Sequence, residues 1–260
     1  MEKLIRVERT LLIGHLISMV FGLAGLLLVL PNPDFIAALP DLGKTAFGWS
    51  MTGGGVAYML LGTSAVAVYA YRTLGIWHCL GFMVPAIGLS LVSELLGTST
   101  GFPFGHYHYL SGLGYKIAGL VPFTIPLSWF YIGFSAYIIV RAGLETLAIP
   151  QPLKYVGAIG FGSLLLTSWD FVLDPAMSQT TTPFWVWEQP GAFFGMPYEN
   201  FAGWFGTGVV FMSVATFIWR LKPLTLSPRQ LGLPLAVYLG NFAFATITSL
   251  AAGIYIPIGL

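Results

Sequence analysis

The sequence predicts an all-α, polytopic membrane protein built as a bundle of seven transmembrane helices. Three observations predict this fold class. Only 8% of the 260 residues are charged and 56% are hydrophobic, whereas a soluble globular domain carries about 25% charged residues. Seven apolar stretches are each long enough to cross a bilayer. Basic residues, finally, gather at one side of these stretches. We expect residues 1–260 to form a single transmembrane domain.

Each predicted helix is an apolar run of about 20 residues, which can cross hydrocarbon with every backbone hydrogen bond satisfied. The first run contains His15, and the third contains His78 and Glu94. The fifth carries Asp170, and the others are uncharged. In chain order the runs are Leu11–Leu30, Phe47–Tyr71, Leu74–Leu96, Val121–Val140, Tyr155–Leu173, Phe201–Trp219 and Leu231–Ile254.

The distribution of basic residues predicts the orientation. With seven spans, nine of the eleven basic residues fall on the side of the N-terminus, and only Lys44 and Lys116 fall on the other side. Positive residues favour the cytoplasmic side. We therefore expect the N-terminus in the cytoplasm and the C-terminus outside. The nine are Lys3, Arg6, Arg9, Arg72, Arg141, Lys154, Arg220, Lys222 and Arg229.

Composition also excludes several classes of protein. The net charge of +1 leaves no basic surface for nucleic acid. The single cysteine, Cys79, cannot form an intrachain disulfide. A retinal photoreceptor needs a lysine in its last helix for the Schiff base, and Leu231–Ile254 contains none.

Acidic residues within the membrane are costly and indicate function. Glu94 lies near the outer end of the third predicted helix, and Asp170 and Asp174 lie near the outer end of the fifth. A spacing of four places the two aspartates on one helix face, and Pro175 is expected to end that helix. We therefore expect the three carboxyl groups, our candidate catalytic residues, to meet at one membrane depth.

The position of these acids favours the protonated form of at least one of them. A helix C-terminus disfavours negative charge, and so do apolar surroundings and neighbouring carboxylates. A protonated carboxyl group could then act as a general acid and a second carboxylate as a base. The alternative is that Glu94 and Asp174 reach headgroup water, with Asp174 paired to Lys116.

Other polar residues near this end are candidates for a supporting role. Asn200 is expected to cap the sixth helix, with Glu199 stabilising its dipole, or both could assist the acids. His106 and His108 are expected to hydrogen-bond to the acids or to lie at the interface. With Glu94 they could instead form a two-histidine, one-carboxylate metal set, but we expect no metal.

Aromatic residues make up 15% of the chain and are concentrated near the acids. An interfacial belt would occupy both membrane surfaces, and we assign only Phe184 and Trp185 to such a belt. Aromatic faces beside a protonating acid suit a carbocation intermediate. The candidate substrate-binding residues are Phe102, Phe104, Trp129, Trp169 and Trp204.

Four segments of the chain have distinctive motifs: Glu94–Tyr109 (ELLGTSTGFPFGHYHY), Val121–Trp129 (VPFTIPLSW), Ser168–Pro175 (SWDFVLDP) and Gly195–Trp204 (GMPYENFAGW). In the same order, they resemble motifs of the carotenoid biosynthesis proteins that act as 1',2'-hydratases of acyclic carotenoids. The resemblance covers most of Ser93–Trp204.

This resemblance implies that water is added to a terminal C1'=C2' double bond without a cofactor, giving a tertiary 1'-hydroxyl. Glu94 or Asp170 would be the acid, and the other or Asp174 would orient water, with His106, His108 and Tyr109 tuning them. The implied partners are water and a membrane-dissolved carotenoid such as gamma-carotene or lycopene, and other enzymes of the pathway are possible partners. The expected location is a prokaryotic cytoplasmic membrane or a photosynthetic internal membrane.

Two other functions remain as alternatives. The histidines and a carboxylate would suit an O₂-dependent, non-haem metal hydroxylase. A proton-coupled transporter would also use intramembrane acids, but it would need them near the bilayer midplane, with a polar path to both faces.

Overall fold

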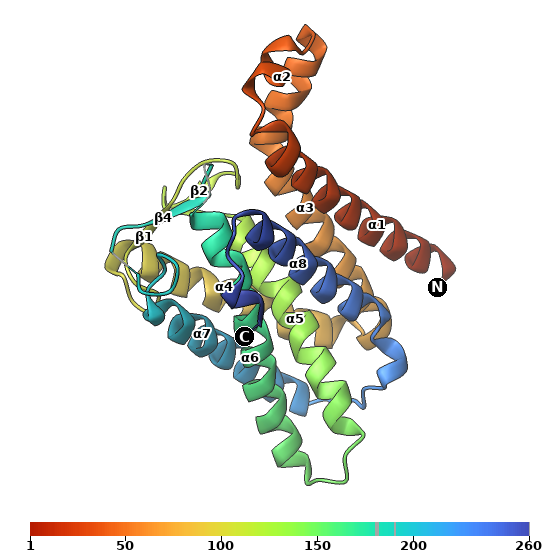
Figure 1. Cartoon of the computed structure of the whole chain (residues 1–260). Coiled ribbons are helices and arrows are strands. Elements are labelled where there is room, and N and C mark those ends of the chain that lie inside the picture. The colour runs from red at the N-terminus through yellow and green to blue at the C-terminus, as the bar shows by residue number, and fades with distance from the viewer. Residues whose placement is uncertain (180–181, 190, 260) are drawn as a thin grey trace.

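The computed structural model describes residues 1–179, 182–189 and 191–259. Within these residues, seven helices are long and apolar enough to span a membrane, so the chain is an all-α polytopic membrane protein. Successive spans run in opposite directions (Figure 1). The spans are α1 (Glu2–Ala24, continued by a π-helical turn, Gly25–Val29), α3 (Asp41–Leu74), α4 (Ile76–Thr100), α5 (Thr124–Glu145), α6 (Gln151–Ser178), α7 (Tyr198–Arg220) and α8 (Gly232–Ala251).

Helix α5 forms the centre of the bundle. It packs against α3, α4, α6 and α8, and it is the most buried of the seven spans. Its aromatic residues Phe130, Tyr131, Phe134 and Tyr137 are fully buried. Its polar residues Ser128, Ser135 and Arg141 are buried as well, and a polar side chain in a span favours the bundle interior over lipid.

Helices α1 and α3 lie at the edge of the bundle and are the least buried spans. They pack closely on each other, and the short helix α2 (Pro33–Ala38) connects them at the far end of the molecule (Figure 1). Helix α3 has 34 residues, or about 51 Å at 1.5 Å per residue. It therefore extends beyond a hydrocarbon core of about 30 Å.

The two long loops that follow α4 and α6 pair with each other. Strand β1 (Tyr107–Tyr109), between α4 and α5, is antiparallel to β4 (Trp185–Trp187), between α6 and α7. A second small ladder joins β2 (Lys116–Ile117) to β3 (Val121–Pro122). Residues 180, 181 and 190, between α6 and α7, lie outside the described residues, as does residue 260.

Several predicted helix ends were wrong. Helix α1 begins at Glu2 rather than Leu11, and α3 begins at Asp41 rather than Phe47. A helix can continue beyond the hydrocarbon with polar residues, which a search for apolar runs does not detect. Helix α6 continues past Pro175 to Ser178. The Ser178 hydroxyl donates to the backbone carbonyl of Asp174 (2.8 Å), and the backbone N–H of Gln179 donates to the backbone carbonyl of Pro175 (3.0 Å). These two bonds close the last turn.

Candidate active site

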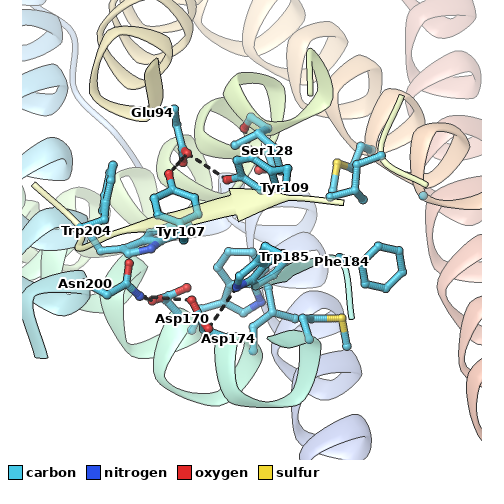
Figure 2. Close-up of a pocket in the computed structure, with 18 of the residues that line it drawn as sticks. Glu94, Tyr107, Tyr109, Ser128, Asp170, Asp174, Phe184, Trp185, Asn200 and Trp204 are labelled. Atoms are coloured by element: carbon cyan, nitrogen blue, oxygen red, sulfur yellow. Dashed lines mark hydrogen bonds between the residues drawn. The ribbon is translucent and has the colours of Figure 1, made fainter. Parts of the chain in front are cut away.

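A cavity of about 90 Å³ lies where α4 and α6 approach the paired loops. All three candidate acids line it, as predicted from the parallel direction of their two helices. Each is at least 97% buried in the protein. Figure 2 shows Glu94 on one side of the Tyr107 and Tyr109 rings, and Asp170 and Asp174 on the other. The other lining residues are Gly55, Tyr58, Met59, Phe104, Leu113, Ile125, Ser128, Trp169, Leu173, Met177, Phe184, Trp185, Trp187, Asn200, Trp204 and Phe244.

Glu94 accepts hydrogen bonds from three neutral donors. The hydroxyls of Tyr107 and Tyr109 donate to Oε2, the latter at 2.9 Å. Trp129 Nε1 donates to Oε1 at 2.9 Å. Tyr107 and Tyr109 both reach Glu94 because alternate residues of a strand point to the same side. Three donors in a buried site compensate a negative charge on Glu94.

Burial, and next the adjacent Glu94 carboxylate, raise the pKa of Tyr107 well above its ordinary value. The same two causes raise the pKa of Tyr109. Both phenols therefore remain protonated at neutral pH, which keeps them as donors to Glu94.

Asp174 is held by a second set of donors. Its Oδ1 accepts from Trp185 Nε1 (3.1 Å), Trp187 Nε1 (3.0 Å) and the Ser178 hydroxyl (3.1 Å). Its Oδ2 accepts from Asn200 Nδ2 at 3.2 Å. Among the described residues, Asp174 has no cationic partner. The pair with Lys116, given above as the alternative to a catalytic role, is absent, because that ammonium donates to the backbone carbonyl of Tyr109 (2.5 Å).

Asp170 has a sparser environment than the other two acids. Its Oδ2 accepts from Asn200 Nδ2 at 2.8 Å, and within the described part of the chain no other hydrogen bond reaches its carboxyl group. Asn200 therefore bridges the two aspartates through one amide nitrogen. Its predicted role as the N-cap of α7 was wrong, because α7 already begins at Tyr198, after Pro197.

Aromatic rings form much of the remaining wall. Trp204 stacks on Trp129 with ring centres 3.9 Å apart, and Trp169 meets Trp204 edge-on at 5.8 Å. Trp129, predicted to bind substrate, is not among the lining residues, whereas Phe104, Trp169 and Trp204 line the cavity. Phe102, predicted to bind substrate, does not: its side chain is 71% exposed.

The predicted contacts of His106 and His108 with the three acids are absent. Both histidines are exposed, and His108 Nδ1 lies 2.9 Å from Glu188 Oε1. The alternation of β1 that directs the tyrosines inward directs His108 outward. Within residues 1–179, 182–189 and 191–259, no three His, Cys, Asp or Glu side chains are placed to hold a metal ion. Glu199 is exposed in the first turn of α7, where it favours the helix dipole as predicted.

Sequence reasoning missed three residues of the site. Tyr107 was not selected beside Tyr109, although a two-residue period could have paired them. Trp185 was assigned to the interfacial belt and Trp187 was given no role, yet both donate to Asp174. A strand three residues long carries too little periodicity to show which side faces the acids.

The fold and the site together define a multi-pass membrane protein with a buried, aromatic-walled cavity containing three carboxyl groups. The chain belongs to the carotenoid biosynthesis protein family, whose sequence pattern matches residues 54–260. The bisanhydrobacterioruberin hydratase of Haloarcula japonica is 34% identical over 127 residues. That alignment covers 48% of this chain but only 41% of the relative. No solved structure matches the chain.

Proposed function

We propose that this protein adds water to the terminal C1'=C2' double bond of an acyclic carotenoid end group and forms a tertiary 1'-hydroxyl. The observation that carries the proposal is the meeting of Glu94, Asp170 and Asp174 in one aromatic cavity. Membership of the carotenoid biosynthesis family and similarity to a protein named as a hydratase support it.

The number of hydrogen bonds that each carboxyl group accepts indicates which of the three acids is protonated. Glu94 accepts three and Asp174 accepts four, and each such bond favours the ionised carboxylate. Asp170 accepts one, from the Asn200 amide that it shares with Asp174. Repulsion between neighbouring carboxylates disfavours two negative charges on Asp170 and Asp174, so one of the two holds a proton. We assign that proton to Asp170, because it has fewer donors to stabilise its charge. Asp170 is therefore our proposed general acid.

The reaction balances without a redox cofactor. The Asp170 proton passes to C2', and the π electrons of the double bond form the new C–H bond, leaving a tertiary cation at C1'. Water attacks C1' and gives a proton to Asp174 or Glu94, and transfer back to Asp170 restores the site. The rings of Trp169 and Trp204, both of which line the cavity, offer π faces that stabilise a cation, and Trp129 stacks on Trp204.

The proposed substrates are gamma-carotene, lycopene or a similar carotenoid with an acyclic end. Such a molecule dissolves in the bilayer, which agrees with a protein that consists almost entirely of spanning helices. Other enzymes of carotenoid biosynthesis are its proposed sources of substrate.

Isotopic labelling tests the reaction. Purified protein is given lycopene in detergent, once in ¹⁸O-labelled water and once under ¹⁸O₂. We expect mass analysis to find the label in the product only from water. In deuterated water, one deuterium should appear at C2'. A hydroxyl oxygen derived from O₂, or loss of activity on adding a chelator, would show that the hydratase mechanism is wrong.

A further inference from the structure

A second, larger hollow adjoins the acid cavity. This groove has a volume of about 600 Å³ and lies between the outer halves of α1 and α3, with the π-helical turn along one side. It contains no charged residue. Its lining consists of Ile17, Ser18, Met19, Phe21, Gly22, Gly25, Leu26, Leu30, Ala46, Trp49, Ser50, Met51, Gly53, Gly54, Gly55, Ala57, Tyr58, Phe184 and Phe244.

The groove and the acid cavity share a wall. Gly55, Tyr58, Phe184 and Phe244 line both. Tyr58 and Phe244 are parallel, with ring centres 6.3 Å apart. Figure 2 shows Phe184 on the side of Trp185 that faces away from Asn200, toward α3 and α1. A long molecule lying in the groove could thus reach the acids past these residues.

The groove is open because several of the residues that line it are glycines, which have no side chain. A Cβ atom added at Gly25 or Gly53 would meet nothing within 4 Å, and one at Gly54 would meet only the Ser50 hydroxyl, at 3.8 Å. Gly55 differs from these, since a Cβ there would lie 2.7 Å from the carbonyl oxygen of Gly112, in the loop between β1 and β2.

We propose that this groove binds the polyene chain of the carotenoid and places one end group in the acid cavity. The inference rests on the proposed hydration, which needs a long apolar substrate at an acidic site. Three features support this occupant: the uncharged lining, the continuity with the cavity, and a place on the least buried helices, beside the lipid. The cavity alone is too small for more than an end group and water.

Filling the groove tests the proposal. Gly53→Leu and Gly54→Leu add side chains to open space within it. Gly48→Leu is the matched control, because Gly48 lies on the same helix in open space but does not line the groove. Binding is measured by the circular dichroism that the polyene acquires on the protein. We expect the Kd to rise about tenfold or more in the two groove variants, equivalent to about 1.4 kcal/mol, and to stay unchanged in the control. Unchanged binding in folded groove variants would overturn the proposal.

A labelling experiment covers the case in which the leucine variants do not fold. Gly54→Cys and Gly48→Cys are treated with a bulky maleimide after purification, and the native Cys79 is only 4% exposed. Lycopene should slow the modification of Gly54→Cys but not that of Gly48→Cys. Equal protection by phospholipid alone would make the groove a lipid site and overturn the proposal.

The two proposals can fail separately, because neither binding assay requires turnover. If lycopene binds in the groove but is never hydrated, the proposed reaction fails and the binding site stands. If lycopene is hydrated while both groove assays are negative, the reaction stands and the groove proposal fails.

Discussion

Three acids at the same end of the bundle differ in the donors around them. Glu94 and Asp174 each accept at least three hydrogen bonds, whereas Asp170 accepts one. In a site without a cationic partner among the described residues, these bonds decide where negative charge is tolerated. Identical functional groups can thus take different roles in one cavity.

Replacing Asp170 tests its role as the acid. Asp170→Asn keeps the shape and can still accept from Asn200, but it cannot protonate the substrate. We expect the hydration rate to fall by about 10²–10⁴-fold, the usual contribution of general acid catalysis, while polyene binding is retained. Product formation and binding are measured on the same sample. The control is Glu199→Gln, which removes an exposed acid outside the cavity and should leave the rate unchanged. A near-normal rate in Asp170→Asn would remove this residue from the chemistry.

The pH behaviour of the buried tyrosines is a second prediction at this scale. Burial and Glu94 raise the pKa values of Tyr107 and Tyr109. Their protonated forms therefore stabilise the fold below the unfolded pKa of about 10, and this contribution is lost as pH rises through the higher folded values. In an ultraviolet titration from about pH 9 to 11, the double variant Tyr107→Phe, Tyr109→Phe should ionise as many phenols as the wild type.

The unfolded chain provides the control for that titration. In denaturant all 12 tyrosines of the wild type are exposed, so the double variant should there lose the signal of two phenols. A loss of the same size in the folded protein would contradict the raised pKa values.

At the scale of elements, the pairing of β1 with β4 assembles the site. His108 is opposite Val186, and on either side of this pair Tyr107 and Tyr109 are opposite Trp187 and Trp185. The ladder thus presents two donors for Glu94 from one strand and two for Asp174 from the other. Two segments that look like simple connections in the sequence thus supply four of the side chains that donate hydrogen bonds to these carboxylates.

Breaking this ladder should abolish activity without unfolding the bundle. Val186→Pro removes a backbone donor from β4, which a paired strand does not tolerate. We expect at least a hundredfold loss of hydration, because Trp185 and Trp187 would no longer hold Asp174; a loss of this size is about 2.7 kcal/mol. Helix content is followed by circular dichroism and should not change. Val186→Thr, which keeps the amide, is the matched variant and should remain active. Full activity of Val186→Pro would mean that the pairing does not support the site.

At the scale of the whole molecule, the ends of the bundle differ in charge. We propose the N-terminus in the cytoplasm, because nine of the eleven basic residues then lie on the cytoplasmic side. Several of them are held by acids there: Arg72 Nε lies 2.6 Å from Glu8 Oε2, and Arg141 Nε lies 3.3 Å from Glu145 Oε1. The acid cavity is at the other end.

Reporter fusions test this orientation. Alkaline phosphatase, which is active only outside the cytoplasm, should be active when it is fused at the C-terminus or after Gly105. It should be inactive after Gly75 or Leu147, and a fluorescent protein should give the opposite pattern. The reverse activities would place the acid cavity on the cytoplasmic face.

The sequence alone determined the membrane class, the seven spans, the meeting of the three acids and the resemblance to carotenoid hydratases. These depend on composition, on helical spacing and on the direction of consecutive spans, which are local or additive properties. The tertiary structure decided which residues serve the acids: Tyr107, Trp185 and Trp187 rather than His106, His108 and Lys116. It also decided that Gly53 and Gly54 face a groove rather than another helix. Both choices depend on contacts between segments far apart in the chain, such as the contact between His108 and Glu188, which are 80 residues apart. No local pattern encodes which face of a short strand, or of a glycine-rich turn of helix, will be covered.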